Sequence, residues 1–313
     1  MKFKLAKETR LGARQVNQDC MGQWQTRDAL LLAVADGLGG HARGEVAAQL
    51  AVGLLGAAFQ REAKPKLADP DEFLARVLSA GHAAIMREGQ KLGLPETPRT
   101  VIVACVVQDG YAYWTHVGDC RLYFIRQGRI IYRTRDHTVV QQLIDSGRIR
   151  EEAASSHPER NRLIQCLGGY QAPRPETPSR ERLRKDDLLL LCSDGFWGPL
   201  TQRQILHALA SRPLAEAIPE LVELAEVRAG PQCDNVTVLA LTWGEDRIAE
   251  TQRLPLMSPD VTASPDETPY VTAAEVRDFT ATDPDFVHMT DEEIEKAIEE
   301  LKAALRRNAN SPK

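Results

Sequence analysis

The sequence has no apolar run close to the roughly 20 residues that cross a bilayer, and its longest, such as residues 101–107, are far shorter. The N-terminus, MKFKLAKETR, lacks the apolar core of a secretory signal. Blocks of basic residues are also missing and the net charge is only −5, so neither nucleic acid nor an anionic membrane is expected as a partner. These absences predict a soluble, cytoplasmic protein, which we expect to be a monomer.

Cysteine pairs of the CxxC type are also absent. The six cysteines are scattered, and most lie inside apolar runs, where a thiol acts as a small hydrophobic group. We therefore expect reduced cysteines, with neither disulfides nor a zinc site. They are Cys20, Cys105, Cys120, Cys166, Cys192 and Cys233.

The composition changes at about residue 244. Before it, apolar runs of strand length are interspersed with segments of helical period, which predicts one folded domain over 1–244. Residues 245–290 are rich in proline and acidic residues, cannot bury enough apolar surface to fold alone, and are predicted to be a disordered linker. A capping box at Thr290 and Glu293 and apolar spacings of three and four then predict an amphipathic helix over 291–307.

Blocks of strands and blocks of helices, in place of a strict alternation of the two, predict an α+β fold. Short turns containing Gly110 and Gly128 favour antiparallel hairpins between the strands around 101–133. The expected strands are 30–36, 101–107, 111–119, 121–133, 187–194 and 235–243, and the expected helices are 44–61, 70–92, 202–211 and 220–229.

Four aspartates, Asp36, Asp119, Asp194 and Asp234, each stand at the edge of a strongly apolar run. Any one of them alone is typical of a turn next to glycine. If the four converge, their mutual repulsion either raises their pKa values or recruits divalent cations. Ligation by oxygen alone suits magnesium or manganese better than zinc, and the seven histidines do not cluster with these aspartates.

Five short motifs occur in the order found in one family of enzymes. Together they resemble the PPM-type (type 2C) metal-dependent protein serine/threonine phosphatases, in their bacterial form, over about residues 6–243. The motifs are Arg14-Gln-Val-Asn17-Gln-Asp19; Asp36-Gly37-Leu-Gly39-Gly40-His41 followed by Gly44-Glu45; His116-Val-Gly118-Asp119-Cys-Arg121; Cys192-Ser193-Asp194-Gly195; and Asp234-Asn235-Val-Thr237.

The resemblance implies a four-layer α-β-β-α sandwich of two central antiparallel sheets flanked by helices, with two or three Mn²⁺ or Mg²⁺ ions at one end. Asp36 would bridge two metals, and the carbonyl of Gly37 would bind the first. Asp194 and Asp234 would bind the second metal, and Asp119 would contribute to a third.

The resemblance also implies the reaction: a hydroxide that bridges the metals attacks the phosphorus of a phosphoserine or phosphothreonine in line. Arg14 would grip the phosphate, and Asp19 would hold a water bound to a metal. The general acid is not identified, because Leu38 stands where some members of the family carry histidine. His41 and His137 are substitutes, although stabilising a turn and capping a helix are the simpler roles for them.

The sequence departs from the family pattern at Pro98-Arg99-Thr100, where Gly-Thr-Thr is usual, and at Cys120, where serine is usual. Neither change removes a proposed metal ligand. Residues 136–175 match the variable flap of bacterial members, which should lie beside the cleft and affect the choice of substrate. Its Arg160 and Arg162 either contact a phosphoprotein or remain solvated on a loop.

Two other functions are weighed against the phosphatase. One is a catalytically weak regulator that binds phosphoproteins and uses the 291–307 helix to dock a partner, but the expected ligands are all present. The other is a metal-dependent phosphodiesterase on another fold, for which histidine-rich ligation would be expected. The resemblance implies phosphorylated proteins as partners, among them a cognate serine/threonine kinase and its substrates.

Overall fold

The computed structural model describes residues 1–38, 43–175 and 179–244. The predicted linker at 245–290, the predicted helix at 291–307 and His41 lie outside the described residues. Among the described residues, no helix is both long enough and apolar enough to span a membrane.

The strands form two five-stranded sheets, and every pair of neighbouring strands is antiparallel. The first sheet has the order β1-β10-β9-β6-β7 and the second has the order β2-β3-β4-β5-β8. The strands are β1 Phe3–Arg10, β2 Asp19–Gln25, β3 Ala29–Gly37, β4 Thr100–Gln108, β5 Tyr111–Val117, β6 Arg121–Arg126, β7 Arg129–Arg133, β8 Ser179–Arg182, β9 Leu188–Cys192 and β10 Val236–Trp243.

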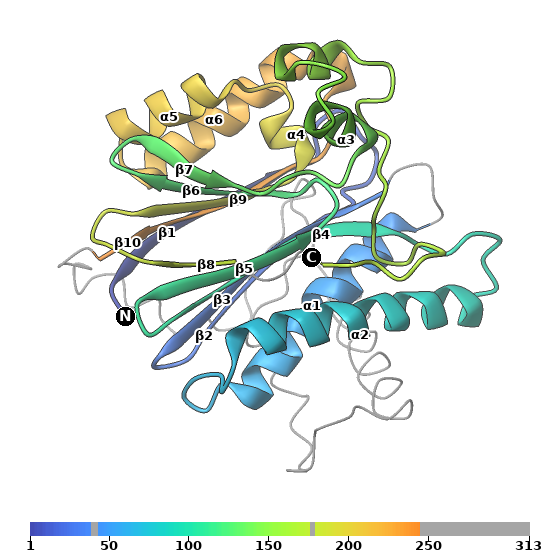
Figure 1. Ribbon diagram of the computed structural model, residues 1–313, viewed down its shortest axis with the longest axis horizontal. Helices are drawn as coiled ribbons and strands as arrows, with labels where there is room; N and C mark the ends of the chain where they lie inside the picture. The colour runs from blue at the N-terminus through green and yellow to red at the C-terminus, as the bar shows by residue number, and fades with distance from the viewer. Residues whose placement is uncertain (39–42, 176–178, 245–313) are drawn as a thin grey trace, which may run out of the picture.

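Helices cover the two outer faces of this pair of sheets (Figure 1). Helix α1 packs on β2, β3 and β4 of the second sheet with α2 beside it, and α6 packs on β1 and β10 of the first sheet with α5 beside it. This arrangement confirms the predicted four-layer sandwich. The helices are α1 Gly44–Glu62, α2 Pro70–Lys91, α3 Val139–Asp145, α4 Asp194–Trp197, α5 Gln202–Ser211 and α6 Leu214–Ala229.

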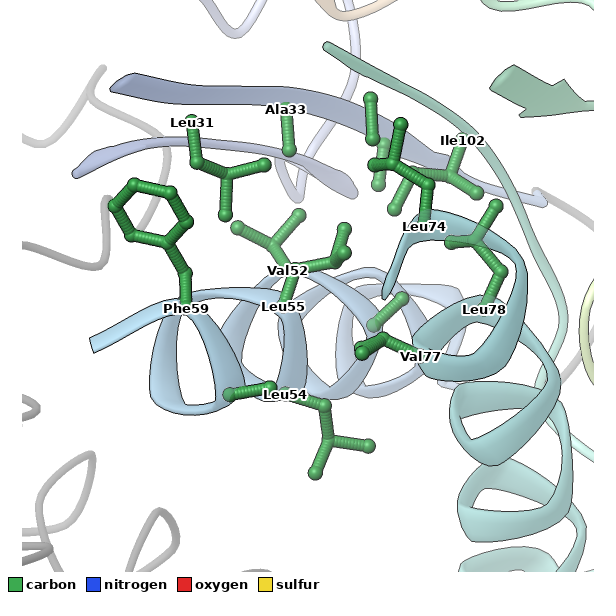
Figure 2. Packing of buried hydrophobic residues seen from close by; sticks show 14 of the residues in the cluster. Leu31, Ala33, Val52, Leu54, Leu55, Phe59, Leu74, Val77, Leu78 and Ile102 are labelled. Atoms are coloured by element: carbon green, nitrogen blue, oxygen red, sulfur yellow. The ribbon is translucent and has the colours of Figure 1, made fainter. Parts of the chain in front are cut away.

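The outer layer below the second sheet is held by apolar side chains of α1. Figure 2 shows Val52, Leu55 and Phe59 directed toward the strands that carry Leu31 and Ile102. All five side chains are fully buried. Burying each one stabilises the fold by about 1.5–3 kcal/mol, so this face of α1 is a major contributor to the packing of the layer.

Strand β3 is buried on both faces, which explains why its sequence is a continuous apolar run and not an alternation. Leu31 and Ala33 pack against the helices, whereas Leu32 and Val34 pack into the core between the two sheets. The strand therefore ends in a well-ordered interior, and its last side chains are rigidly positioned.

The structure adds strands that the sequence did not predict and lengthens one helix at its start. Strands β1, β2 and β8, which all lie at edges of the two sheets, were missed. Lysine, arginine and glutamate obscure the apolar pattern of β1 and β8. Helix α6 begins at Leu214 and continues through Pro219, whereas a start at 220 was expected. The burial of Ala217 and Ile218 favours the longer helix over the break that proline usually causes. The six cysteines are free thiols, as predicted.

Candidate active site

Strand ends from both sheets bring the predicted aspartates to one end of the sandwich. Asp36 lies near the end of β3 and is paired in register with Asp19 at the start of β2. Asp194 follows the end of β9, and Asp234 precedes the start of β10. Because β9 and β10 are antiparallel neighbours, the end of one and the start of the other share an edge of the sheet.

The pKa values show that these carboxylates lie close enough to repel one another. Burial, followed by the charges of Asp19 and Asp194, raises the pKa of Asp36 well above its usual value. Burial also raises the pKa of Asp19 to about 7 and that of Asp194 to about 6, with Asp234 adding to both shifts. The cluster therefore carries more negative charge than its surroundings neutralise.

Two buried carboxylate oxygens, Oδ1 of Asp19 and Oδ1 of Asp194, have no hydrogen-bond donor among the described residues. No group of three or more Asp, Glu, His or Cys side chains in the described ranges has the spacing of a formed metal site. Asp36 and Asp194 instead lie close enough for their charges to interact, and Arg14 donates a hydrogen bond to Asp234. The surplus of buried anionic oxygens fits hard divalent cations, because these ions prefer oxygen ligands and supply the missing positive charge.

Asp19 is held in place by a buried network of hydroxyl groups. Ser193 Oγ donates to Asp19 Oδ2 at 2.7 Å and accepts from the backbone N–H of Thr237 at 3.0 Å. The hydroxyl of Thr237 lies 2.9 Å from that of Thr9. This network links β2, β9 and β10, so that Asp19 has one oxygen fixed and the other turned away from any donor. The sequence placed Ser193 and Thr237 in motifs without indicating this role.

Arg14 lies over the acidic cluster at the rim. Its Nη2 donates to Asp234 Oδ2 at 2.7 Å, with the two side chains 51% and 39% exposed. The loop that carries Arg14 is fixed by Asn235, whose Nδ2 donates to the carbonyls of Leu11 at 2.9 Å and Val16 at 3.2 Å. Asn235 is thus a positioning residue that sequence reasoning missed, although it stands directly after a proposed ligand.

Two glycines permit the close approaches on which the cluster depends. A Cβ at Gly37 would lie 2.4 Å from the carbonyl oxygen of Gly44 at the start of α1. A Cβ at Gly195 would lie 2.0 Å from the carbonyl oxygen of Asn235. Both positions exclude a side chain on packing grounds, whether or not the Gly37 carbonyl binds a metal.

Asp119 lies between β5 and β6 and faces the same cluster. Burial and then the charge of Asp194 raise its pKa well above the usual value. The indole N–H of Trp197 donates to the Asp119 carbonyl at 3.0 Å. Arg121, paired through two hydrogen bonds with Asp136, stacks on Trp197 with the guanidinium carbon 3.3 Å from the ring centre.

His137 does not have the capping role expected for it. Thr138 is the residue that caps α3, and its side chain accepts from the backbone N–H of Gln141. His137 Nδ1 instead accepts from the backbone N–H of Gly118 at 3.1 Å, and its ring stacks on His116 at 4.5 Å. Burial lowers the pKa of His116, which favours the neutral form of that ring. The pair supports the turn that precedes Asp119.

The unusual segment at 98–100 remains part of the site's framework. Thr100 Oγ1 donates to the carbonyl of Asp36 at 2.7 Å, and Leu38 donates its N–H to the carbonyl of Arg99 at 3.0 Å. Thr100 and Leu167 exchange backbone hydrogen bonds of 3.1 and 2.8 Å. The departure from Gly-Thr-Thr therefore leaves the strand intact and attaches the end of the predicted flap to the Asp36 backbone.

The chain is similar to known bacterial phosphatases over most of its length. It is 36% identical to the serine/threonine protein phosphatase PstP of Mycobacterium tuberculosis over 76% of this chain and 45% of that protein. The chain thus spans less than half of that relative. It is 30% identical to the protein phosphatase PhpP of Streptococcus pneumoniae over 74% of this chain and 94% of PhpP.

Solved structures agree with these similarities. The M. tuberculosis PstP structure matches with a TM-score of 0.68 and 35% identity, over 78% of this chain and 99% of that one. A structure of the PstP catalytic domain in complex with two manganese ions matches with a TM-score of 0.65 and 33% identity, over 77% and 97%. Stp1 from Staphylococcus aureus matches with a TM-score of 0.72 and 26% identity, over 78% and 96%.

The protein phosphatase 2C family description matches residues 8–226, which include every residue of the cluster except Asp234. With this match and the bacterial relatives, the chain belongs to the protein phosphatase 2C family, in its bacterial form.

Proposed function

We propose that this chain is a metal-dependent protein serine/threonine phosphatase that hydrolyses phosphoserine and phosphothreonine. The observation that carries the proposal is the convergence of Asp36, Asp194 and Asp234, beneath Arg14, at one end of the sandwich. A catalytic metal site needs an excess of oxygen ligands, and phosphate binding needs a cation at its rim. The complete set of carboxylates gives no support to the alternative of a weak, non-catalytic regulator.

The proposed ions are Mn²⁺ or Mg²⁺, and the manganese complex of the related PstP domain supports this choice. Asp36 and the Gly37 carbonyl would hold the first ion, and Asp36, Asp194 and Asp234 the second. Asp119 would contribute to a third. When bound, the metals supply Lewis-acid chemistry that activates water and neutralises phosphate charge.

The protein's own residues bind the substrate phosphate and shape the site. Arg14 presents a planar guanidinium that can donate to two phosphate oxygens, which lysine cannot reproduce. Asn235 holds the Arg14 loop, so that only the side chain needs to turn from Asp234 toward substrate. Asp19, anchored by Ser193, has a free oxygen that can accept from a water molecule in the cluster.

The wider assignments remain predictions from the sequence. We propose residues 1–244 as the catalytic domain, 136–175 as its flap, and phosphorylated proteins, including a cognate kinase and its substrates, as partners. We also propose, from the sequence alone, that the protein is a monomer and is cytoplasmic. The linker at 245–290 and the helix at 291–307 are proposed on sequence pattern alone.

Hydrolysis of para-nitrophenyl phosphate in the presence of manganese, magnesium or chelator tests the proposal. Asp194→Asn should reduce the metal-dependent rate by at least about 100-fold, because it removes an anionic ligand. Asp28→Asn, the same change at an exposed aspartate, is the matched control and should leave the rate unaltered. A wild-type protein without metal-dependent activity, or an undiminished Asp194→Asn variant, would refute the assignment.

A further inference from the structure

The segment Pro98-Arg99-Thr100, which departs from the family pattern, lies next to the end of the flap at Tyr170, an exposed aromatic residue. The side chain of Tyr170 is 81% exposed, more than any other large hydrophobic side chain in the described residues. The guanidinium carbon of Arg99 lies 5.2 Å from the centre of the Tyr170 ring. Arg99, which the family pattern does not predict, thus lies against the ring of Tyr170, and packing in a core does not explain the position of that ring.

The register of β3 and β4 places Arg99 close to the proposed bridging ligand. Asp36 pairs with Val101, and the hydrogen bond from Leu38 to the Arg99 carbonyl extends this ladder by one step. Side chains two residues apart on a strand share a face, so Arg99 follows Val101 on the face that carries Asp36. Diagonal neighbours across an antiparallel pair are about 7–8 Å apart.

The chain does not neutralise the charge of Arg99 within its described residues. No carboxylate in these ranges pairs with its guanidinium, and its buried Nε has no hydrogen-bond partner there. Arg121, another arginine close to the site, is by contrast paired with Asp136. Arg99 is therefore a cation available to a ligand, held beside the site where phosphate would bind.

Resting on the proposed phosphatase function, we infer that Arg99, covered by Tyr170, binds an acidic side chain of the substrate close to the phosphorylated residue. An extended peptide advances about 3.3 Å per residue. The separation of Arg99 from Asp36 therefore matches an acidic residue two or three positions from the phosphorylated one. The Tyr170 ring lies within cation–π distance of the guanidinium and helps to position it for the ionic contact.

A peptide series tests this preference. Phosphothreonine peptides that carry Glu, Gln or Lys at each of the three positions on either side are compared by kcat/KM at low salt. For wild type, Glu two or three positions away should be preferred over Lys by about two- to fivefold, the size of an ion pair at a protein rim. The preference should decline as salt is raised to 0.3 M, since salt screens partly exposed charges.

Three variants separate recognition from folding. Arg99→Gln should abolish the Glu preference and Arg99→Lys should retain most of it. The preference is measured as a ratio of kcat/KM values within one variant, so that a change in overall activity cancels. Arg203→Gln removes the same charge from the exposed surface of α5 and should leave the preference intact. A purely structural contact with Tyr170 would lower activity on all the peptides alike.

The outcomes distinguish the two proposals. Absence of metal-dependent hydrolysis of para-nitrophenyl phosphate by wild type would overturn the phosphatase function, and the inference with it. Normal hydrolysis with no preference for Glu at any position, or a preference that persists in Arg99→Gln, would overturn the inference alone. The salt dependence of wild type shows separately whether the preference is ionic, and a preference that does not decline with salt would also overturn the inference.

Discussion

At the scale of single residues, Arg14 has two partners. One is the carboxylate of Asp234, and the other, by our proposal, is the phosphate of the substrate. In the structure its guanidinium holds Asp234, and the charges of Asp194 and Asp36 add to the raised pKa of Arg14. An ion that binds Asp234 has to compete with Arg14. Metal binding is therefore expected to release Arg14 toward the substrate.

This competition predicts that Arg14→Gln binds Mn²⁺ more tightly, by about two- to fivefold, the equivalent of an exposed ion pair. Titration calorimetry of the metal-free protein measures the affinity directly. The same variant should lose activity on phosphate esters, because the phosphate loses its two-pronged donor. Arg14→Lys, which keeps the charge, should restore the wild-type metal affinity but not the activity. Weaker Mn²⁺ binding by Arg14→Gln would contradict this account.

At the scale of secondary-structure elements, Arg126 links the two sheets at a place outside the carboxylate cluster. Arg126 of β6 donates to both carboxylate oxygens of Asp187, at 2.8 and 2.7 Å, and to the carbonyl of Arg182 in β8 at 2.8 Å. Because β6 belongs to the first sheet and β8 to the second, one guanidinium joins the two sheets. The Asp187 carboxylate is almost fully buried, so it depends on this partner.

Arg126→Ala should lower the free energy of unfolding by about 3 kcal/mol, because it leaves the Asp187 carboxylate buried without its countercharge. Urea denaturation with an unchanged m-value measures the loss. The exposed Arg203→Ala is the control and should stay within about 0.5 kcal/mol of wild type. An effect of that small size for Arg126→Ala would show that the pair contributes little to joining the sheets.

At the scale of the whole molecule, the acidic cluster links stability to both pH and metal. The pKa values of about 7 for Asp19 and about 6 for Asp194 lie above the ordinary 3.8. At pH values between 3.8 and these raised pKa values, Asp19 and Asp194 of the metal-free native protein hold protons that the unfolded chain has lost. This contribution to stability is full at low pH and is lost as the pH rises toward 7.

The melting temperature of the protein in chelator is therefore expected to decrease as the pH rises from 5 to 7.5. Added Mn²⁺ should raise it more at pH 7.5 than at pH 5, because protons and metal compete for the same oxygens. Thermal unfolding at the two pH values, with and without Mn²⁺, measures both effects, and Asp194→Asn should reduce them. A metal stabilisation at pH 5 equal to that at pH 7.5 would argue that the metal binds elsewhere.

The strong apolar runs and the caps could be predicted because they depend on local chemistry. The cap of α2 by Asp69, the capping box of α5 at Thr201 and the hairpin turn at Gly128 all form where the sequence indicates them. Edge strands such as β1 could not be found in this way, because their polar faces remove the apolar alternation.

The sequence by itself determined which residue types are available to the site: its ordered motifs name Asp36, Asp194, Asp234 and Arg14. Only the tertiary structure decided that these side chains share one cluster. It also showed that Asn235 holds the Arg14 loop, that Ser193 anchors Asp19, and that Arg99 lies under Tyr170. The reason is physical, since these contacts join segments up to about 220 residues apart, and only the pairing of strands and sheets brings them within hydrogen-bond distance.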